Sequence, residues 1–243
     1  MTNFKEIKTK TYEDMSREAA QIIFDALKEN ETFSLGLATG STPEGMYEVL
    51  ATLINDEKLD LSHLTTFNLD EYVGLDEDDD QSYHYFMDEH LFSKLDIPKE
   101  NINILNGVAS DLDKEVKEYE SLIDETGIDI QVLGIGRNGH IAFNEPGTSF
   151  ESLTGKVQLT DETIEDNSRF FEKKEDVPTE ALSMGLKTIM KAKQIILLIS
   201  GDNKQRAREL FVSGKVSEDV PASILHNHDN VILITDEAAR GEE

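Results

Sequence analysis

The sequence of 243 residues contains no cysteine, so it can form no disulfide bond and cannot use a thiolate as a nucleophile. Long apolar runs are also missing, because the longest, Ile195–Ile199, is far shorter than a membrane span. The N-terminal stretch MTNFKEIKTK lacks the apolar core of a signal peptide. These absences predict a cytoplasmic protein with no membrane segment.

Basic residues are scarce, since 23 Lys and Arg stand against 50 Asp and Glu and the net charge is −27. Such a field repels nucleic acid and anionic membranes, so neither is an expected partner. The acidic run Asp76–Asp80 lacks the spacing and central glycine of an EF-hand, which favours a solvated loop over a Ca²⁺ site. An anionic substrate would need a local positive pocket, so Lys and Arg residues near glycine-rich loops are informative.

From Thr11 onward the chain alternates helical and strand patterns, with no repeat and no linker. Thr11 and Asp14 form a capping box ahead of a helical run that reaches Ala26. Strands are expected at 33–37, 64–69, 102–105, 128–135, 194–200 and 231–235, and helices at 43–54, 82–92 and 111–125. This order predicts an α/β fold: one domain over 1–243 with an open, mostly parallel sheet and helices on both faces. Residues 160–186 fit the rhythm least and are expected to form helices outside the sheet.

The loop Gly134–Gly147 follows a predicted buried strand, the place where open α/β folds put their chemistry. Its glycines match the dinucleotide pattern G-x-G-x-x-G, but Pro146 stands where the required helix would continue, which argues against a dinucleotide site. His140 can exchange a proton near neutral pH, and Glu145 can orient its ring and stabilise its cation. A structural histidine is the alternative.

A second loop, Thr39–Gly40–Ser41–Thr42, precedes a predicted helix in which Pro43 takes the first position and Thr42 acts as the cap. Backbone N–H groups and hydroxyl groups at a helix N-terminus form an anion site. No Gly-Lys-Ser/Thr follows, so a simple phosphate is favoured over a nucleoside triphosphate. A capped turn without a ligand remains an equal alternative.

Asp70 and Glu71 stand at the end of a third strand, where a partly buried carboxylate can act as a general base. A helix cap or loop acid is the alternative, and no third ligand for Mg²⁺ is evident. Lys204 is expected in the first turn of the helix that follows the predicted strand 194–200. Arg169 has a guanidinium group that can form two hydrogen bonds to a phosphate. Each of the two can either bind a phosphate or be an ordinary surface charge. One ligand reconciles the four loops: a small phosphorylated molecule handled by carboxylates and a histidine, with no metal and no cofactor.

The strings LATGSTPEGMY, TFNLDEYVGL, SYHYFM, GIGRNGHIAFNEPG, NSRFF and VPTEALSMGL occur in the order and spacing of glucosamine-6-phosphate deaminases. The chain resembles that family over residues 3–236. The resemblance implies conversion of glucosamine 6-phosphate and water to fructose 6-phosphate and ammonia in amino-sugar catabolism. It also implies the Rossmann-like fold shared with ribose-5-phosphate isomerases and 6-phosphogluconolactonases, and a mobile lid within 148–186.

The resemblance also implies a role for each candidate residue. Asp70 would move the proton between C2 and C1, and His140, with Glu145 and Asn138, would handle the ring-oxygen proton as the pyranose opens. The remaining residues would hold the phosphate: Thr39, Gly40, Ser41, Thr42, Arg169 and Lys204. Glu71 and Tyr72 belong to the Asp70 motif with less certain roles.

Two positions depart from some family members. Asn138 replaces an Asp, which leaves Glu145 alone to support a His140 cation. Allosteric members carry basic residues that bind N-acetylglucosamine 6-phosphate where this chain has Gly155 and Val157, although Lys156 lies between them. The sequence therefore predicts hyperbolic kinetics without that activator, and it leaves open a monomer or a homo-oligomer.

Three other functions compete with the deaminase. A 6-phosphogluconolactonase shares the fold and the phosphate loop but needs no Asp70 proton shuttle. A galactosamine-6-phosphate deaminase differs only in how the pocket reads C4. A sugar-phosphate-sensing regulator would carry a basic helix-turn-helix segment, for which this acidic chain has no room.

Overall fold

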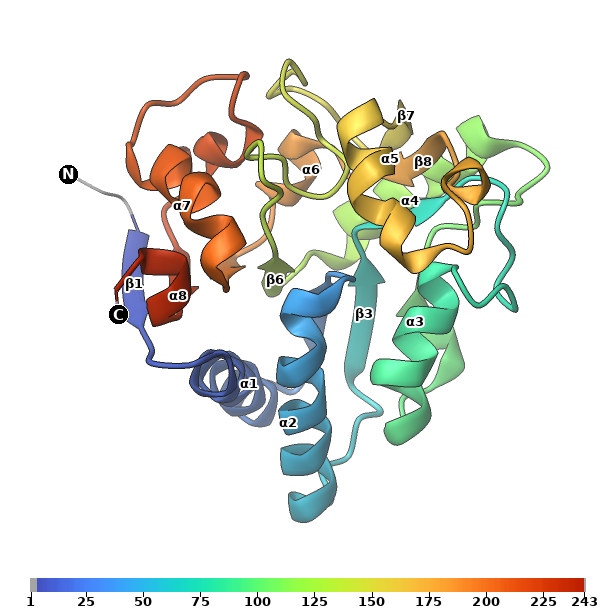
Figure 1. Ribbon diagram of the computed structural model, residues 1–243. Coiled ribbons are helices and arrows are strands. Elements are labelled where there is room, and N and C mark those ends of the chain that lie inside the picture. Colours follow the sequence, from blue (N-terminus) through green and yellow to red (C-terminus); the bar gives the residue numbers. More distant parts are fainter. Residues whose placement is uncertain (1–3, 243) are drawn as a thin grey trace.

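The computed structural model describes residues 4–242, which form two sheets with helices packed around them (Figure 1). The strands are β1 (Phe4–Lys8), β2 (Phe33–Leu37), β3 (Leu64–Asn68), β4 (Asp70–Tyr72), β5 (Ile102–Asn103), β6 (Ile130–Leu133), β7 (Gly155–Gln158), β8 (Glu180–Ser183), β9 (Gln194–Ile199) and β10 (Val231–Thr235). The helices are α1 (Tyr12–Glu29), α2 (Ser41–Glu57), α3 (Tyr83–His90), α4 (Leu112–Thr126), α5 (Asp161–Asn167), α6 (Leu186–Ile189), α7 (Gln205–Val212) and α8 (Glu237–Arg240).

The large sheet has seven strands in the order β1-β10-β9-β6-β2-β3-β5, and every neighbouring pair is parallel. This confirms the expected α/β fold with a mostly parallel sheet. Because all strands run the same way, the loops after β2, β3, β6 and β9 emerge at one edge of the sheet. Those are the four loops in which the sequence places candidate chemistry.

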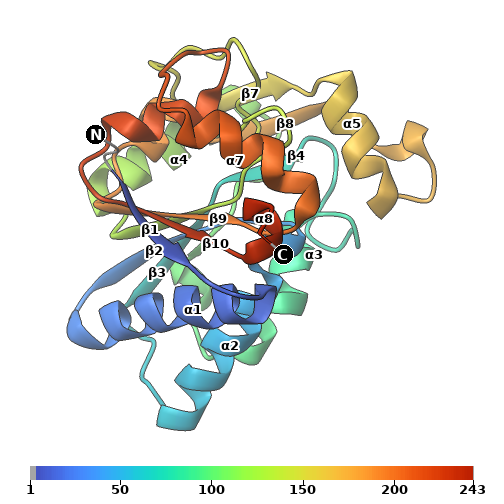
Figure 2. The ribbon, with the colours of Figure 1, turned by 60° about the vertical axis from the view of Figure 1, so that its left-hand side comes forward.

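Both faces of the large sheet are covered, as Figures 1 and 2 show. Successive strand residues point to opposite faces, so Ile196 and Leu198 of β9 pack in a core with α1 and α2. Leu197 and Ile199 pack in a second core with α4, α6 and α7. In the described part of the chain, no helix is long and apolar enough to cross a membrane.

A second, antiparallel sheet of three strands, β4-β8-β7, lies beyond the C-terminal edge of the first. The expectation that 160–186 is helical was therefore wrong in part: α5 is a helix, but 180–183 forms β8 between β4 and β7. β7 and β8 are too short and too polar on one side to give a strand pattern without their partners, since β7 alternates half-buried and exposed residues.

No strand is predicted for the N-terminal residues, yet β1 pairs with β10 at the sheet edge. Only its pairing with β10 reveals this strand, because its residues FKEIK are partly exposed and carry no continuous apolar run. The predicted cap is confirmed: the Thr11 side chain accepts a hydrogen bond of 3.2 Å from the backbone N–H of Asp14. The other predicted elements are present, with ends that differ by a few residues.

Candidate active site

Four loops meet at the C-terminal edge of the large sheet, because β9, β6, β2 and β3 are consecutive neighbours. The Lys204 Nζ after β9 donates to the Ile135 carbonyl after β6, at 2.8 Å. Next to β3, the Leu69 N–H donates to the Leu37 carbonyl of β2 at 3.1 Å. The structure thus gathers at one edge the loops that the sequence singled out separately.

The loop after β2 leads directly into α2. Gly40 is the N-cap, and its φ of 92° lies in the region that favours glycine. A Cβ at Gly40 would meet no atom within 4 Å, so the loop faces open space. The helix begins at Ser41, so the N-terminal N–H groups of α2 lie beside that space, as an anion site requires.

The expected cap of this helix was wrong. Thr42 lies inside the first turn, Pro43 takes the third helical position, and no side chain caps the helix N-terminus. The physical reason is that the left-handed Gly40 already turns the chain into the helix, which leaves the first N–H groups unblocked by a side chain. An uncapped start suits a bound anion better than the predicted cap would.

Asp70 begins β4, at the junction between the two sheets. Its residue is 6% exposed, and burial, reinforced by the negative charge of Glu71, raises its pKa to about 8. The Tyr83 side chain hydrogen-bonds with those of Thr39 and Tyr72, which places α3 against both β4 and the phosphate loop. Asp70 is therefore a carboxylate that accepts a proton readily near neutral pH.

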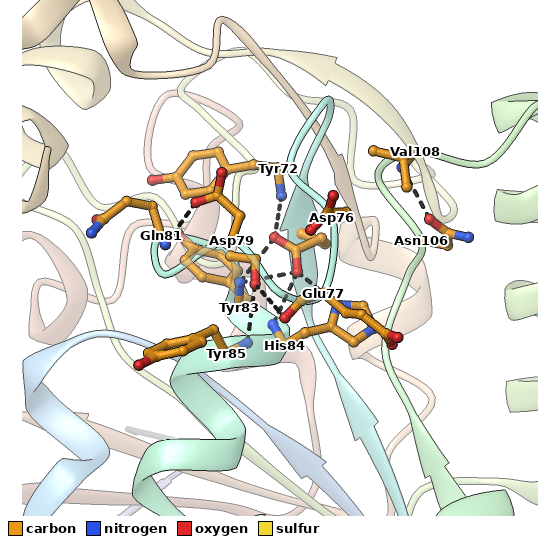
Figure 3. Close-up of polar contacts among 12 residues, drawn as sticks. Tyr72, Asp76, Glu77, Asp79, Gln81, Tyr83, His84, Tyr85, Asn106 and Val108 are labelled. Atoms are coloured by element: carbon orange, nitrogen blue, oxygen red, sulfur yellow. Dashed lines mark hydrogen bonds and ion pairs between the residues drawn. The ribbon is translucent and has the colours of Figure 1, made fainter.

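Glu71, the next residue of β4, is fully buried. It accepts backbone hydrogen bonds from Tyr72 at 2.8 Å, from Tyr83 at 3.0 Å and from His84 at 3.0 Å. The His84 ring nitrogen Nδ1 lies 2.9 Å from the same carboxylate. Figure 3 shows these donors, from Tyr72, Tyr83 and His84, converging on one point.

His140, Asn138 and Glu145 form one hydrogen-bonded group after β6. Asn138 Oδ1 lies 2.8 Å from His140 Nδ1, and Asn138 Nδ2 donates to Glu145 Oε2 at 2.9 Å. Glu145 Oε2 itself lies 3.5 Å from His140 Nδ1. Asn138 and Glu145 therefore both lie beside the same ring nitrogen, with Asn138 the nearer of the two, and the role of Glu145 in orienting the ring stays a prediction. A Cβ at Gly136 would lie 2.0 Å from the His140 ring, so this turn requires a glycine there.

The other oxygen of Glu145, Oε1, accepts hydrogen bonds from the hydroxyl groups of Thr160 and Thr163. Burial opposes its ionisation, but hydrogen bonding and charge from His140, with hydrogen bonds from Thr163 and Asn138, outweigh burial and lower its pKa to about 2. The sequence did not assign these threonines to the site. Their only local signal is that Thr160 caps α5 and Thr163 follows in its first turn.

Lys204, Arg169 and Arg137 place positive charge at the same edge. Burial lowers the pKa of Lys204, and the nearby charges of Arg169 and Arg137 lower it further. Lys204 ends a short turn just before α7 rather than lying within the helix. In a chain with a net charge of −27, this grouping of cations indicates an anion site.

The segment 148–186 contains β7, α5 and β8 and contacts this edge from above (Figure 1). The Asn167 amide donates to the Tyr72 hydroxyl at 2.8 Å, and Asp166 accepts a hydrogen bond of 2.9 Å from Arg137 Nε. With the two threonines on Glu145, α5 is tied to three points of the site. Its role as a lid remains a prediction.

Among residues 4–242, no three or more His, Asp or Glu side chains are grouped so that they could hold a metal ion. The acidic run Asp76–Asp80 forms a mostly exposed loop, as expected.

Comparison with known proteins places the chain among sugar-phosphate enzymes. Residues 7–234 match the family described as glucosamine-6-phosphate isomerases/6-phosphogluconolactonase. A glucosamine-6-phosphate deaminase of Oceanobacillus iheyensis is 51% identical over 236 residues, covering 97% of this chain and 94% of that protein. The deaminase of Clostridium acetobutylicum is 52% identical over 229 residues, covering 94% and 95%.

Solved structures agree with this placement. A monomeric glucosamine-6-phosphate deaminase superposes with a TM-score of 0.96 at 47% identity and covers 99% of this chain and 100% of that one. The 6-phosphogluconolactonase of Thermotoga maritima superposes with a TM-score of 0.76 at 21% identity, covering 96% and 99%. At that identity the second likeness concerns the fold alone.

Proposed function

The chain belongs to the family of glucosamine-6-phosphate isomerases and 6-phosphogluconolactonases, and from this premise we propose that it is an enzyme converting glucosamine 6-phosphate and water to fructose 6-phosphate and ammonia. The observation that carries the proposal is the identity of 51% to a deaminase over nearly the whole chain. The reaction belongs to amino-sugar metabolism. The site geometry supports each step as follows.

The phosphate group binds at the loop Thr39–Thr42. The uncapped N-terminus of α2 supplies N–H groups, Thr39, Ser41 and Thr42 add hydroxyl groups, and Arg169 and Lys204 supply charge. Binding energy at this end of the sugar fixes the position of C1 and C2 at the other end.

Ring opening is the task of His140. The reaction requires proton transfer to the ring oxygen and from the C1 hydroxyl group, which an imidazole can perform near neutral pH. Asn138 orients the ring through Nδ1, and the ionised Glu145 stabilises the imidazolium behind it. The product of this step is the open-chain aldehyde, whose carbonyl group acidifies the proton on C2.

Asp70 then acts as the base. Its carboxylate takes the C2 proton to give an enolamine and returns a proton to C1, which leaves an imine at C2. Water adds to that imine, and ammonia leaves with fructose 6-phosphate as the other product. Burial beside Glu71 makes Asp70 a stronger base than an exposed aspartate, as this step requires.

Hydrolysis of a lactone needs no proton shuttle between C2 and C1, and the lactonase likeness shows the fold alone. The full-length similarity to deaminases therefore favours the deaminase. We propose glucosamine over galactosamine on the same ground. The cytoplasmic location and the oligomeric state remain predictions, although the solved relative is described as monomeric.

The test is release of ammonia from glucosamine 6-phosphate by the purified protein, with galactosamine 6-phosphate and 6-phosphogluconolactone as competing substrates. We expect ammonia from glucosamine 6-phosphate and a loss of about 10²–10⁴-fold in Asp70→Asn. Absence of ammonia release from the wild type would refute the proposal. A faster reaction with galactosamine 6-phosphate would reassign the substrate.

A further inference from the structure

Glu71 is a buried carboxylate that does not itself react in the proposed steps. Its side chain is 0% exposed and accepts hydrogen bonds from the backbones of Tyr72, Tyr83 and His84, with the His84 ring as a further partner. Backbone N–H groups that donate to a carboxylate form strong, directional hydrogen bonds. A buried anion with this many partners fixes the parts of the fold that donate to it.

The parts it fixes are β4 and the N-terminus of α3. Tyr83 and His84 are the first two residues of α3, whose N–H groups lack partners within the helix, and a negative charge there is favourable. Ser82 caps the same end through the N–H of Tyr85, at 3.0 Å. The Glu71 carboxylate thus joins α3 to the strand that carries Asp70.

Through α3, Glu71 also reaches the phosphate loop. The Tyr83 side chain hydrogen-bonds with Thr39 and Tyr72, and its ring centroid lies 4.8 Å from that of Tyr72. Asp70, Tyr72 and the start of α3 are therefore held in register by one side chain. A shift of Glu71 would move the base and the phosphate loop relative to each other.

The charge of Glu71 acts on Asp70 as well. Burial raises the pKa of Asp70, and the negative charge of Glu71 raises it further. Four tyrosines of α2, β4, α3 and α4 are also in electrostatic contact with Asp70, and their pKa values are all raised, so they stay neutral where Asp70 titrates: Tyr47, Tyr72, Tyr83 and Tyr119. The His84 ring also contacts Glu71, with its Nδ1 2.9 Å from the carboxylate.

We propose that Glu71 is a positioning residue for this reaction: it holds β4 and α3 in register and, by its negative charge, strengthens Asp70 as a proton acceptor without touching the substrate. The inference rests on the proposed function, because it assigns a role within that reaction. It predicts that the charge of Glu71 affects the pH dependence of the reaction, whereas the length of its side chain affects kcat.

The experiment compares kcat/KM at pH 6 and pH 9 in the wild type, Glu71→Gln and Glu71→Asp. The quantity compared is kcat/KM at pH 6 divided by kcat/KM at pH 9, because a general loss of activity cancels in this ratio. Removing the charge in Glu71→Gln shifts the acidic limb down by about one pH unit, which raises the ratio about tenfold. Glu71→Asp keeps the charge but shortens the side chain, so we expect a wild-type ratio with kcat reduced about tenfold.

Two controls locate the effect. Glu77→Gln removes a charge from the exposed neighbouring loop and should leave both the ratio and kcat unchanged. His84→Gln keeps a hydrogen-bond donor but removes the imidazole ring, so it should leave the ratio unchanged. A changed ratio in His84→Gln would assign the acidic limb to His84 and overturn the proposal.

A wild-type ratio in Glu71→Gln would also overturn the inference, as would a ratio in Glu71→Asp shifted as far as in Glu71→Gln. If Glu71→Gln does not fold, the ratio and kcat of Glu71→Asp decide the matter alone. Failure of the proposed function is distinguishable, because then the wild type itself would release no ammonia from glucosamine 6-phosphate.

Discussion

Replacing Asp70 by Asn tests whether the ionised Asp70 carboxylate lowers the free energy of unfolding of the protein. Burial, followed by the charge of Glu71, raises the pKa of Asp70 from 3.8 to about 8. The folded protein therefore holds this proton more tightly than the unfolded chain does. The contribution of Asp70 to stability is complete below about pH 4, falls as the pH rises toward 8, and stays lost above pH 8.

The magnitude follows from the same shift. One proton of difference between the folded and unfolded states changes the free energy of unfolding by about 1.4 kcal/mol per pH unit. Between pH 5 and pH 7, both inside the window, the wild type should lose roughly 3 kcal/mol relative to Asp70→Asn. The conversion applies because Asp70 is only 6% exposed. Against a total stability of about 5–15 kcal/mol, such a change is measurable.

The assay is urea unfolding of the wild type and Asp70→Asn at pH 5 and pH 7, with ammonia release measured on the same samples. Asp78→Asn, in the exposed acidic loop, is the matched control and should track the wild type at both pH values. We expect the variant to lose about 10²–10⁴-fold in activity and to become increasingly more stable than the wild type as the pH rises. An equal stability difference at pH 5 and pH 7 would refute the reasoning, because it would mean that Asp70 titrates alike in both states.

Three further predictions concern the His140 group and regulation. Glu145→Gln should lose most activity, about 10²-fold in kcat, because the imidazolium loses its counter-charge; near-normal turnover would contradict this. Thr163→Val removes a hydroxyl donor from Glu145 and should lower kcat about tenfold with little change in KM, whereas a change confined to KM would point to binding instead. Initial rates should follow a hyperbola without N-acetylglucosamine 6-phosphate, because Lys156 lies 3.0 Å from Glu180 and its neighbours Gly155 and Val157 carry no charge; a sigmoidal curve that this compound straightens would count against it.

Much of the fold was predictable because its signals are local. Apolar runs such as Gln194–Ile199 and Val231–Thr235 stand between helical patterns, and this alternation has few solutions other than a parallel sheet. β1 and the sheet β4-β8-β7 were not predictable in the same way. Their residues alternate or are polar, so they become strands only when a partner supplies the hydrogen bonds.

The candidate site divides in a similar way. The sequence by itself determined which side chains follow the strands of the large sheet, including Asp70, His140 and Lys204. Apolar strands and glycine-rich turns can be recognised from neighbouring residues alone. Only the tertiary structure decided what surrounds them: the Thr163 hydroxyl group on Glu145, the Ile135 carbonyl group on Lys204 Nζ, and the burial of Asp70. Hydrogen-bond partners and desolvation depend on atoms distant in the chain, and the sequence order does not encode their separation directly.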